Sequence, residues 1–183
     1  MSEESLVLYC SPTLAGLKTG SLFTTEYTQE TKLMDEIRRL NRTLAVKGLR
    51  VIPMRETGGR VLIYVYRPSK LEKDFTDSHT SRILEEMGYP CGRPEQCVVY
   101  LARKLREGKS FPHEIGLFLG YPPEDVQGFI ENKAGNFKCI GCWKVYGDVE
   151  QAQKKFQIFK KCTDIYYAQW LKGFSIERLT VAA

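Results

Sequence analysis

Two runs of sequence decide the fold: Arg50-Val-Ile-Pro-Met-Arg55 and Arg60-Val-Leu-Ile-Tyr-Val-Tyr-Arg67, joined by Glu56-Thr-Gly-Gly59. Extended runs rich in β-branched and aromatic residues, with a short glycine segment between them, predict a β-hairpin. Residues 61–66 are apolar throughout, so we expect an interior strand with both faces buried. Pro53 has no N–H for a neighbouring strand, which predicts that the first strand lies at an edge or contains a bulge.

Upstream of the hairpin, the apolar spacing predicts an amphipathic helix from Thr28 to Lys47, ended by Gly48. Residues 6–9 are expected to be extended. They lead into a second helix that begins at Ser11 and Pro12, because serine caps helices and proline suits their first position. This second helix would carry Leu14, Leu17 and Leu22.

Downstream of the hairpin, helical and extended patterns occur without regular alternation, which favours an α+β fold. We expect about four strands in a small, mainly antiparallel sheet packed with several helices, and one domain over residues 1–183. The capping pair Asp148 and Gln151 marks the start of the last long helix. The expected segments are helices at 78–87, 94–107, near 112, 123–132 and 148–172, and strands at 136–146 and 175–181.

Composition excludes several classes of protein. The chain of 183 residues is 43% hydrophobic and 11% aromatic, so it can form a core and is neither disordered nor fibrous. Its longest apolar run, residues 61–66, is far shorter than the roughly 20 residues of a membrane-spanning helix. The acidic N-terminus is no signal peptide. We therefore expect a soluble, cytoplasmic protein with no membrane association.

The net charge and the cysteines fit the same setting. Lys and Arg number 27 and Asp and Glu 22, giving +5, but the basic residues are dispersed among acids. This dispersion is typical of solvated helix faces and argues against a nucleic-acid partner. Six cysteines are too few for a disulfide scaffold, so each is expected to be a free thiol.

Cys10 and His113 are the strongest candidates for chemistry. If Cys10 precedes a helix, the helix dipole stabilises its thiolate and lowers its pKa. His113, also at an expected helix start, would stay neutral and act as a base. Such a pair could carry out acyl or amide transfer, with the ring oriented by one of Glu114, Asp125, Asn136 or Asp148. The alternative is a buried structural cysteine and a polar helix cap.

Cys139-Ile-Gly-Cys142 is a CxxC pair. Because it lies in an expected strand, its two thiols would point to opposite faces unless Gly141 makes a turn. The other half of a zinc site would be Cys91 and Cys97, whose spacing is wider than usual. We therefore predict no cofactor, and the spacing argues against structural zinc at Cys139 and Cys142.

Residues 111–126 form a second candidate site. Gly120 can take a left-handed conformation and Pro122-Pro123 begins a new helix, so a sharp corner is expected here. This corner could be only a rigid connection, or it could present Tyr121 and the acids Glu124 and Asp125 to a ligand.

Three strings together resemble a bacterial family called domain of unknown function 3793. They are Cys10-Ser-Pro-Thr-Leu-Ala-Gly-Leu-Lys18, Phe111-Pro-His-Glu-Ile-Gly-Leu-Phe-Leu-Gly-Tyr-Pro-Pro-Glu-Asp-Val126 and Cys142-Trp-Lys-Val-Tyr-Gly-Asp148, supported by Val65-Tyr-Arg-Pro68. The resemblance covers nearly the whole chain and implies a cytosolic bacterial protein, but no activity. It directs attention to the residues that match these strings: Cys10, Lys18, Arg67, His113, Glu114, Tyr121, Trp143 and Asp148.

Two functions follow. The first is a cysteine-dependent hydrolase or transferase, with Cys10 as nucleophile, His113 as base, and Glu114 or Asp148 in support. The alternative is a non-catalytic module that binds a small molecule or a protein at the Phe111–Val126 corner. In the second case Lys18, Arg67, Tyr121 and Trp143 would contact the ligand.

Overall fold

The central element is a three-stranded antiparallel sheet with the order β1-β3-β2. The computed structural model describes residues 2–27, 29–90, 92–108 and 110–182. In it β3 (Arg60–Tyr66) lies between β1 (Gly20–Glu26) and β2 (Arg50–Thr57). The register of β2 against β3 shifts between Pro53 and Arg55. The predicted hairpin, its interior strand and the irregular edge strand at Pro53 are confirmed.

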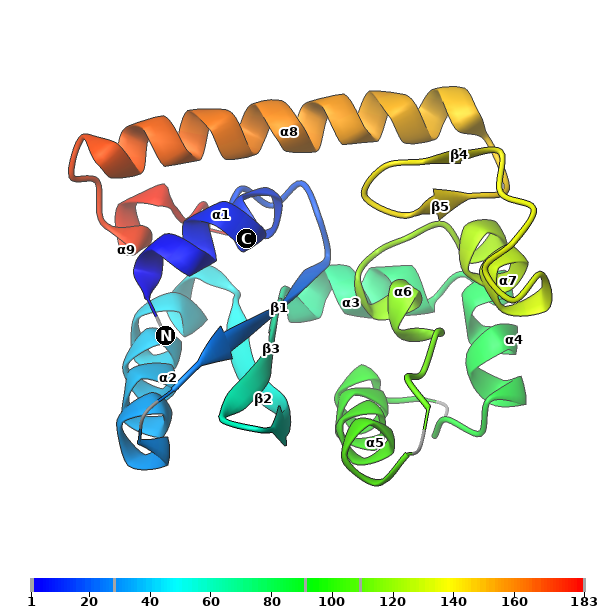
Figure 1. Cartoon of the computed structure of the whole chain (residues 1–183), viewed down its shortest axis with the longest axis horizontal. Coiled ribbons are helices and arrows are strands. Elements are labelled where there is room, and N and C mark those ends of the chain that lie inside the picture. Colours follow the sequence, from blue (N-terminus) through cyan, green and yellow to red (C-terminus); the bar gives the residue numbers. More distant parts are fainter. Residues whose placement is uncertain (1, 28, 91, 109, 183) are drawn as a thin grey trace.

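The two faces of β3 support two different cores. Val61, Ile63 and Val65 pack in one hydrophobic cluster, whereas Tyr64 and Tyr66 belong to the other. This follows from the period of two along a strand, which places alternate side chains on opposite faces. Figure 1 shows α1 (Glu3–Leu14) and α2 (Glu30–Leu44) at one end of the molecule with the sheet, and α3–α7 at the other.

The helices of the second group follow β3 along the chain. They are α3 (Pro68–Phe75), α4 (Ser78–Glu86), α5 (Pro94–Glu107), α6 (Ile115–Phe118) and α7 (Pro123–Glu131). All but α3 correspond to segments expected from the sequence, and α2 ends as predicted, through the short 3-10 helix η1 (Ala45–Lys47) and the left-handed Gly48.

A long helix joins the two ends of the molecule. After the small antiparallel pair β4 (Cys139–Ile140) and β5 (Lys144–Val145), α8 (Val149–Leu171) runs along one side of the protein to α1 and α9 (Ile176–Leu179) (Figure 1). Asp148 caps α8 by accepting from the Gln151 N–H at 3.0 Å, as the capping pair predicts. The chain is α+β, in agreement with the predicted fold class.

The prediction for the N-terminal segment is wrong. Leu6 to Tyr9 is helical, because Ser2 caps α1 and accepts from the Ser5 N–H, and acidic residues occupy the first turn. Pro12 lies inside the last turn of α1 rather than at a helix start, and costs the helix one hydrogen bond. The expected helix from Ser11 to Leu22 does not form: its first residues are the end of α1, and Leu22 lies in the strand β1, which pairs with β3.

Two further segments differ from expectation. Residues 136–146 contain the short hairpin β4–β5, with a turn that includes Gly141, rather than one strand. Residues 175–181 contain α9, because the Ser175 side chain accepts from the Arg178 N–H and starts a helix there. In the described part of the chain, no helix combines the length and apolarity needed to cross a membrane.

Candidate functional site

Cys10 lies in the interior of α1 and not at its start. Its exposed fraction is 0%, and it packs in the core cluster with Leu6, Leu14 and Phe23. Burial raises its pKa to about 12, against a smaller opposing effect of the Lys18 charge. The predictions of a helix-start thiol and of a lowered pKa are therefore wrong. At neutral pH this thiol is protonated and enclosed.

His113 is exposed and comes two residues before α6, with its ring centroid 4.9 Å from that of Phe129. Glu114 is buried, and its Oε1 accepts from the Lys104 ammonium and from the Tyr89 hydroxyl. Glu114 is thus held by Lys104 of α5 and by Tyr89 of the segment that precedes α5. Among the residues described, Glu114 and His113 form no hydrogen bond.

Asp148 and Arg67 both bind backbone groups of the protein itself. The Asp148 carboxylate caps α8. Arg67 is 1% exposed and donates to the carbonyl oxygens of Thr13, Leu14 and Val181, each at 2.7 Å. Its guanidinium therefore binds the end of α1 and the C-terminal segment, and has no surface left for a ligand.

Three of the four residues predicted to bind a ligand come together. The Lys18 Nζ lies 5.1 Å from the centroid of the Tyr121 ring, and that ring stacks on Trp143 at 4.8 Å and 27°. The Tyr121 hydroxyl also donates to the Cys142 carbonyl at 3.3 Å. Both side chains are half-buried, and this burial lowers the pKa of Lys18 and raises that of Tyr121 to about 12.

Beside Tyr121 and Trp143 is a hollow of about 470 Å³, which we call the hairpin pocket. One wall comes from the predicted corner and α7, and the other from the β4–β5 hairpin. The lining is mainly aromatic and aliphatic: Phe111, His113, Ile115, Gly116, Tyr121, Asp125, Val126, Phe129, Ile140, Gly141, Cys142, Trp143 and Lys144. Its volume and apolar character are typical of small-molecule sites.

Asp125 holds the two walls together. It is 3% exposed, and one oxygen accepts from the Trp143 Nε1–H at 2.7 Å. The other accepts from the backbone N–H groups of Tyr146 and Gly147, both at 2.7 Å. With three donors on one buried carboxylate, Asp125 positions the hairpin over α7 and is occupied by protein. From the sequence, Asp125 is one of four candidates to orient His113 and one of the acids that the corner could present to a ligand.

The polar groups left to face a ligand in the hairpin pocket are few. Lys144 donates from Nζ to the Ala134 carbonyl at 2.7 Å and lies 4.7 Å from the centroid of the Phe137 ring. Cys142 is exposed, and burial of its thiol raises its pKa while the nearby Lys18 charge opposes the shift. His113 completes the set. The sequence does not indicate roles for Lys144 and Phe129. These roles depend on the short β4–β5 hairpin, where the sequence predicts a single strand.

The two cysteines of the CxxC pair lie in different surroundings. Cys139 is half-buried against the cluster of Trp143, Val145 and Ala152, whereas Cys142 is exposed in the turn. Within the described ranges, no three His, Cys, Asp or Glu side chains gather in a group that could hold a metal ion.

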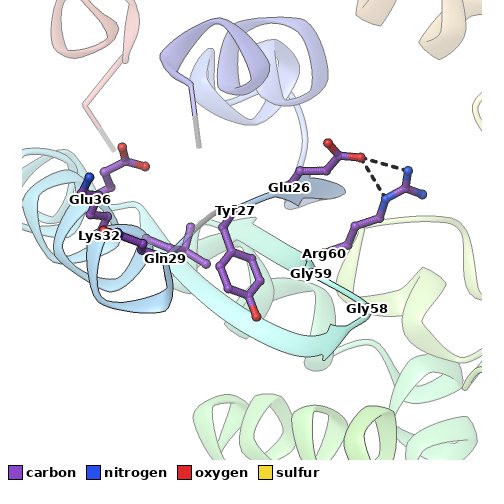
Figure 2. Close-up of a pocket in the computed structure, with 9 residues that line it drawn as sticks. Glu26, Tyr27, Gln29, Lys32, Glu36, Gly58, Gly59 and Arg60 are labelled. Atoms are coloured by element: carbon purple, nitrogen blue, oxygen red, sulfur yellow. Dashed lines mark hydrogen bonds and ion pairs between the residues drawn. The ribbon is translucent and has the colours of Figure 1, made fainter.

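A different hollow, of about 450 Å³, lies between the start of α2 and the β2–β3 turn. Figure 2 shows Glu26, Tyr27 and Lys32 around it, with Arg60 paired to Glu26. The Arg60 guanidinium donates to that carboxylate at 3.0 and 3.2 Å. Its charged groups have both signs and are exposed or half-buried, so they favour no particular ligand.

Comparison with known proteins places the chain in a family. No curated protein and no solved structure matches it. A family model described as a protein of unknown function, DUF3793, matches residues 6–180 and so includes both walls of the hairpin pocket. The chain therefore belongs to the DUF3793 family.

Proposed function

We propose that this protein is a binding module whose hairpin pocket takes a small, planar, mainly apolar molecule with an acidic group. The observation that carries the proposal is the hollow of about 470 Å³ between the Phe111–Val126 corner and the β4–β5 hairpin. Pockets of this size and lining bury most of the surface of a small ligand.

The aromatic walls favour a flat ligand. Tyr121 and Trp143 are already stacked on each other, and Phe129, which also lines the pocket, packs against His113. Flat rings pack against such side chains in offset or edge-to-face arrangements, with a gain beyond the burial of area. A planar apolar body would therefore complement this lining.

The charges favour an acidic group on that ligand. The Asp125 carboxylate is occupied by three donors, and the other ionisable lining groups are His113, Tyr121, Cys142 and Lys144. Lys144 supplies a fixed positive charge at the edge, and Lys18 adds a second beside Tyr121. Among the lining residues, no acidic side chain other than Asp125 opposes a carboxylate or sulfonate.

Binding without covalent chemistry is favoured over the cysteine-dependent reaction. The expected nucleophile Cys10 is enclosed in the core. A thiol that is protonated and inaccessible cannot attack a substrate in the pocket. We also infer a reducing bacterial cytoplasm as the setting, because Cys10, Cys139, Cys142 and Cys162 are free thiols.

The test uses Trp143 as a reporter. In a Trp170→Phe background, Trp143 is the only tryptophan, because the chain has two. Three probes share one ring and differ in charge: 4-nitrobenzoate, 4-nitrobenzamide and 4-nitrobenzylammonium. We expect saturable quenching of Trp143 fluorescence. Of the three probes, 4-nitrobenzoate should bind with the highest affinity. Absence of saturable quenching by 4-nitrobenzoate, or tighter binding of the cation, contradicts the proposal.

A matched pair of variants tests the role of the lysine. Lys144→Gln removes the charge at the pocket and should weaken 4-nitrobenzoate binding about two- to fivefold, leaving 4-nitrobenzamide unchanged. Lys138→Gln removes a lysine from the same hairpin region, where its Nζ donates to the Gly147 carbonyl and does not line the pocket. Lys138→Gln should change neither affinity.

A further inference from the structure

A second hollow, of about 520 Å³, lies on the other side of the segment that carries Phe111 and His113, which line both cavities. We call it the Glu114 hollow. It is bounded by Met87, Tyr100, Phe111, His113, Glu114 and Ile130, with charged groups of α5 at its edge. We propose that this hollow is a separate ligand site, in which Glu114 binds the N–H or O–H donor of an uncharged aromatic ring.

The carboxylate of Glu114 carries the inference. Its side chain is only 5% exposed, yet both of its donors, the Lys104 ammonium and the Tyr89 hydroxyl, bind the same oxygen, Oε1. No described residue donates to Oε2. Oε2 is also not among the enclosed polar atoms that lack a partner, of which the described residues contain one, the Tyr146 hydroxyl. Oε2 therefore keeps some accessible surface, and the hollow is the cavity that Glu114 lines.

The Glu114 side chain is only 5% exposed, so little water reaches Oε2, and a carboxylate oxygen with neither a protein donor nor full hydration is costly. A ligand that donates a hydrogen bond to Oε2 replaces the hydrogen bonds from water that the oxygen lost on burial. Such a bond to a charged acceptor is stronger than one between neutral groups. The hollow is thus complementary to a donor at one defined atom.

The surrounding charges select an uncharged ligand. Lys104 already balances the charge of Glu114, and the Arg103 guanidinium lies 4.9 Å from the centroid of the Tyr100 ring. A cationic ligand would meet both of these positive groups. An anionic ligand would meet Glu114 and also Glu107, which lines the same hollow. A neutral donor avoids both repulsions.

The remaining lining selects a flat ring. Tyr100, Phe111 and His113 present ring surfaces, and Met87 and Ile130 add flexible and aliphatic contacts. Nitrogen heterocycles with an N–H group and neutral phenols share the required chemistry. This proposal does not depend on the hairpin pocket being occupied, because its acceptor is a different carboxylate with a different lining.

The experiment compares 5-fluoroindole, which has an N–H donor, with 5-fluoro-1-methylindole, which has none. Binding to the full chain is followed by ¹⁹F NMR, and the site by backbone amide shifts in ¹⁵N-labelled protein. We expect 5-fluoroindole to bind about tenfold more tightly than its methylated analogue, as a hydrogen bond to a charged group predicts. Amides of residues 100–104 and 113–114 should shift. Equal affinity of the two probes, no saturable binding, or shifts confined to residues 141–144 would overturn the proposal.

Glu114→Gln supplies the matched variant. Lys104 and Tyr89 both donate, so the amide oxygen must turn to them and the NH₂ group faces the hollow. The variant should lose the tenfold preference for 5-fluoroindole, whereas Glu107→Gln at the edge should keep it. Retention of the preference in Glu114→Gln overturns the proposal.

A filling substitution keeps the test decisive if Glu114→Gln does not fold. Ile130→Trp narrows the hollow from α7, where Ile130 is half-buried, and leaves the carboxylate in place. It should weaken both probes by tenfold or more. Unchanged binding in Ile130→Trp contradicts the proposal. Quenching of Trp143 by 4-nitrobenzoate is measured separately, so failure at one site is distinguished from failure at the other.

Discussion

At the scale of single residues, the two cysteines beside Lys18 differ in what they can do. Cys10 is enclosed in the core with a pKa raised to about 12, whereas Cys142 is exposed at the edge of the hairpin pocket. Both interact electrostatically with the Lys18 ammonium, which lowers their pKa values in opposition to burial. Accessibility, rather than the nearby charge, therefore decides which thiol reacts.

Alkylation with iodoacetamide should separate them. In the native protein we expect Cys142 to be labelled and Cys10 to remain unmodified, because reaction requires contact with solvent as well as thiolate. In denaturant both should be labelled. Peptide mapping by mass spectrometry is the measurement, and native labelling of Cys10 at a rate near that of Cys142 would show that the core around α1 opens.

The raised pKa of Cys10 also predicts an alkaline loss of stability. Its ordinary value is 9.0, so in the unfolded chain the thiol ionises near pH 9, whereas in the folded chain it stays protonated to about pH 12. Stability from this group is fully present below pH 9 and is lost as the pH rises from there. The slope approaches about 1.4 kcal/mol per pH unit.

Cys10→Ala isolates this effect. The substitution leaves a small cavity, whose cost is independent of pH, so the two proteins differ by a constant up to about pH 8. Above pH 9 the wild-type free energy of unfolding should fall more steeply than that of the variant. Urea titrations at several pH values give both slopes, and parallel slopes would show that Cys10 does not titrate as its burial requires.

At the scale of elements, the β4–β5 hairpin is too short to hold itself and depends on Asp125. Two paired residues in each strand give a weak hairpin on their own. Its position over α7 comes from the bonds of Asp125 to Trp143, Tyr146 and Gly147. One wall of the hairpin pocket is therefore placed by one carboxylate on another element.

Asp125→Asn should loosen this wall. The amide has one acceptor oxygen for three donors, and its NH₂ group would face an N–H. We expect a loss of about 2–4 kcal/mol in the free energy of unfolding and a red shift of Trp143 emission in the Trp170→Phe background. Glu124→Gln, one residue away and exposed, should leave both unchanged. An unshifted spectrum in Asp125→Asn would mean that the hairpin is held by packing alone.

The elements that the sequence predicted correctly are those with a strong local pattern. The all-apolar run of β3, the glycine turn before it and the stripe of α2 each depend on neighbours along the chain. Pro12 misled the assignment of α1, because proline favours a helix start, whereas here tertiary packing of Leu6, Cys10 and Leu14 maintains the helix through it. No local pattern predicts β1, because its partner β3 lies about forty residues away.

The candidate site is predictable only where a local pattern of sequence marks it. Tyr121 and Trp143 were singled out by their strings, and the structure stacks them. Cys10 lies inside α1, and Arg67 is enclosed, because of contacts between segments that are remote in the sequence. No local pattern contains such contacts. Lys104 meets Glu114 only because α5 packs beside the corner.

At the scale of the whole molecule, two cores share one sheet, and α8 connects the hairpin end with α1 and α9 (Figure 1). We propose that residues 1–183 fold as one domain. The two tryptophans report on different parts: Trp143 on the hairpin cluster and Trp170 on the core of α1 and α2. Trp143→Phe and Trp170→Phe therefore give one reporter for each part.

Unfolding in urea should be a single transition. The change of fluorescence in each single-tryptophan variant should coincide in midpoint with the loss of its own far-ultraviolet circular dichroism, because neither core is complete without the shared sheet. A fluorescence midpoint that departs from the circular dichroism midpoint in either variant would show that the two ends unfold separately, and would contradict the single domain.

Arg67 ties remote parts of the chain together and should be indispensable for stability. It donates to carbonyls at the end of α1, at Lys47 and at Val181. Arg67→Met leaves these buried acceptors without donors, and we expect a loss of about 3–5 kcal/mol. Arg60→Met removes an exposed ion pair and should cost less than about 1 kcal/mol. A small effect at Arg67, measured by urea unfolding, would mean that water replaces it.

The bond from Arg67 to Val181 also sets a condition on biosynthesis. The two residues are 114 positions apart, so a ribosome adding about 5–20 residues per second needs roughly 6–23 s to make the second after the first. Throughout that interval the nascent chain has a guanidinium without its final acceptor, and α1 is without its partner helix α8. A molecular chaperone that binds unfinished chains would find its target in this window, and translation pauses after β3 would lengthen it.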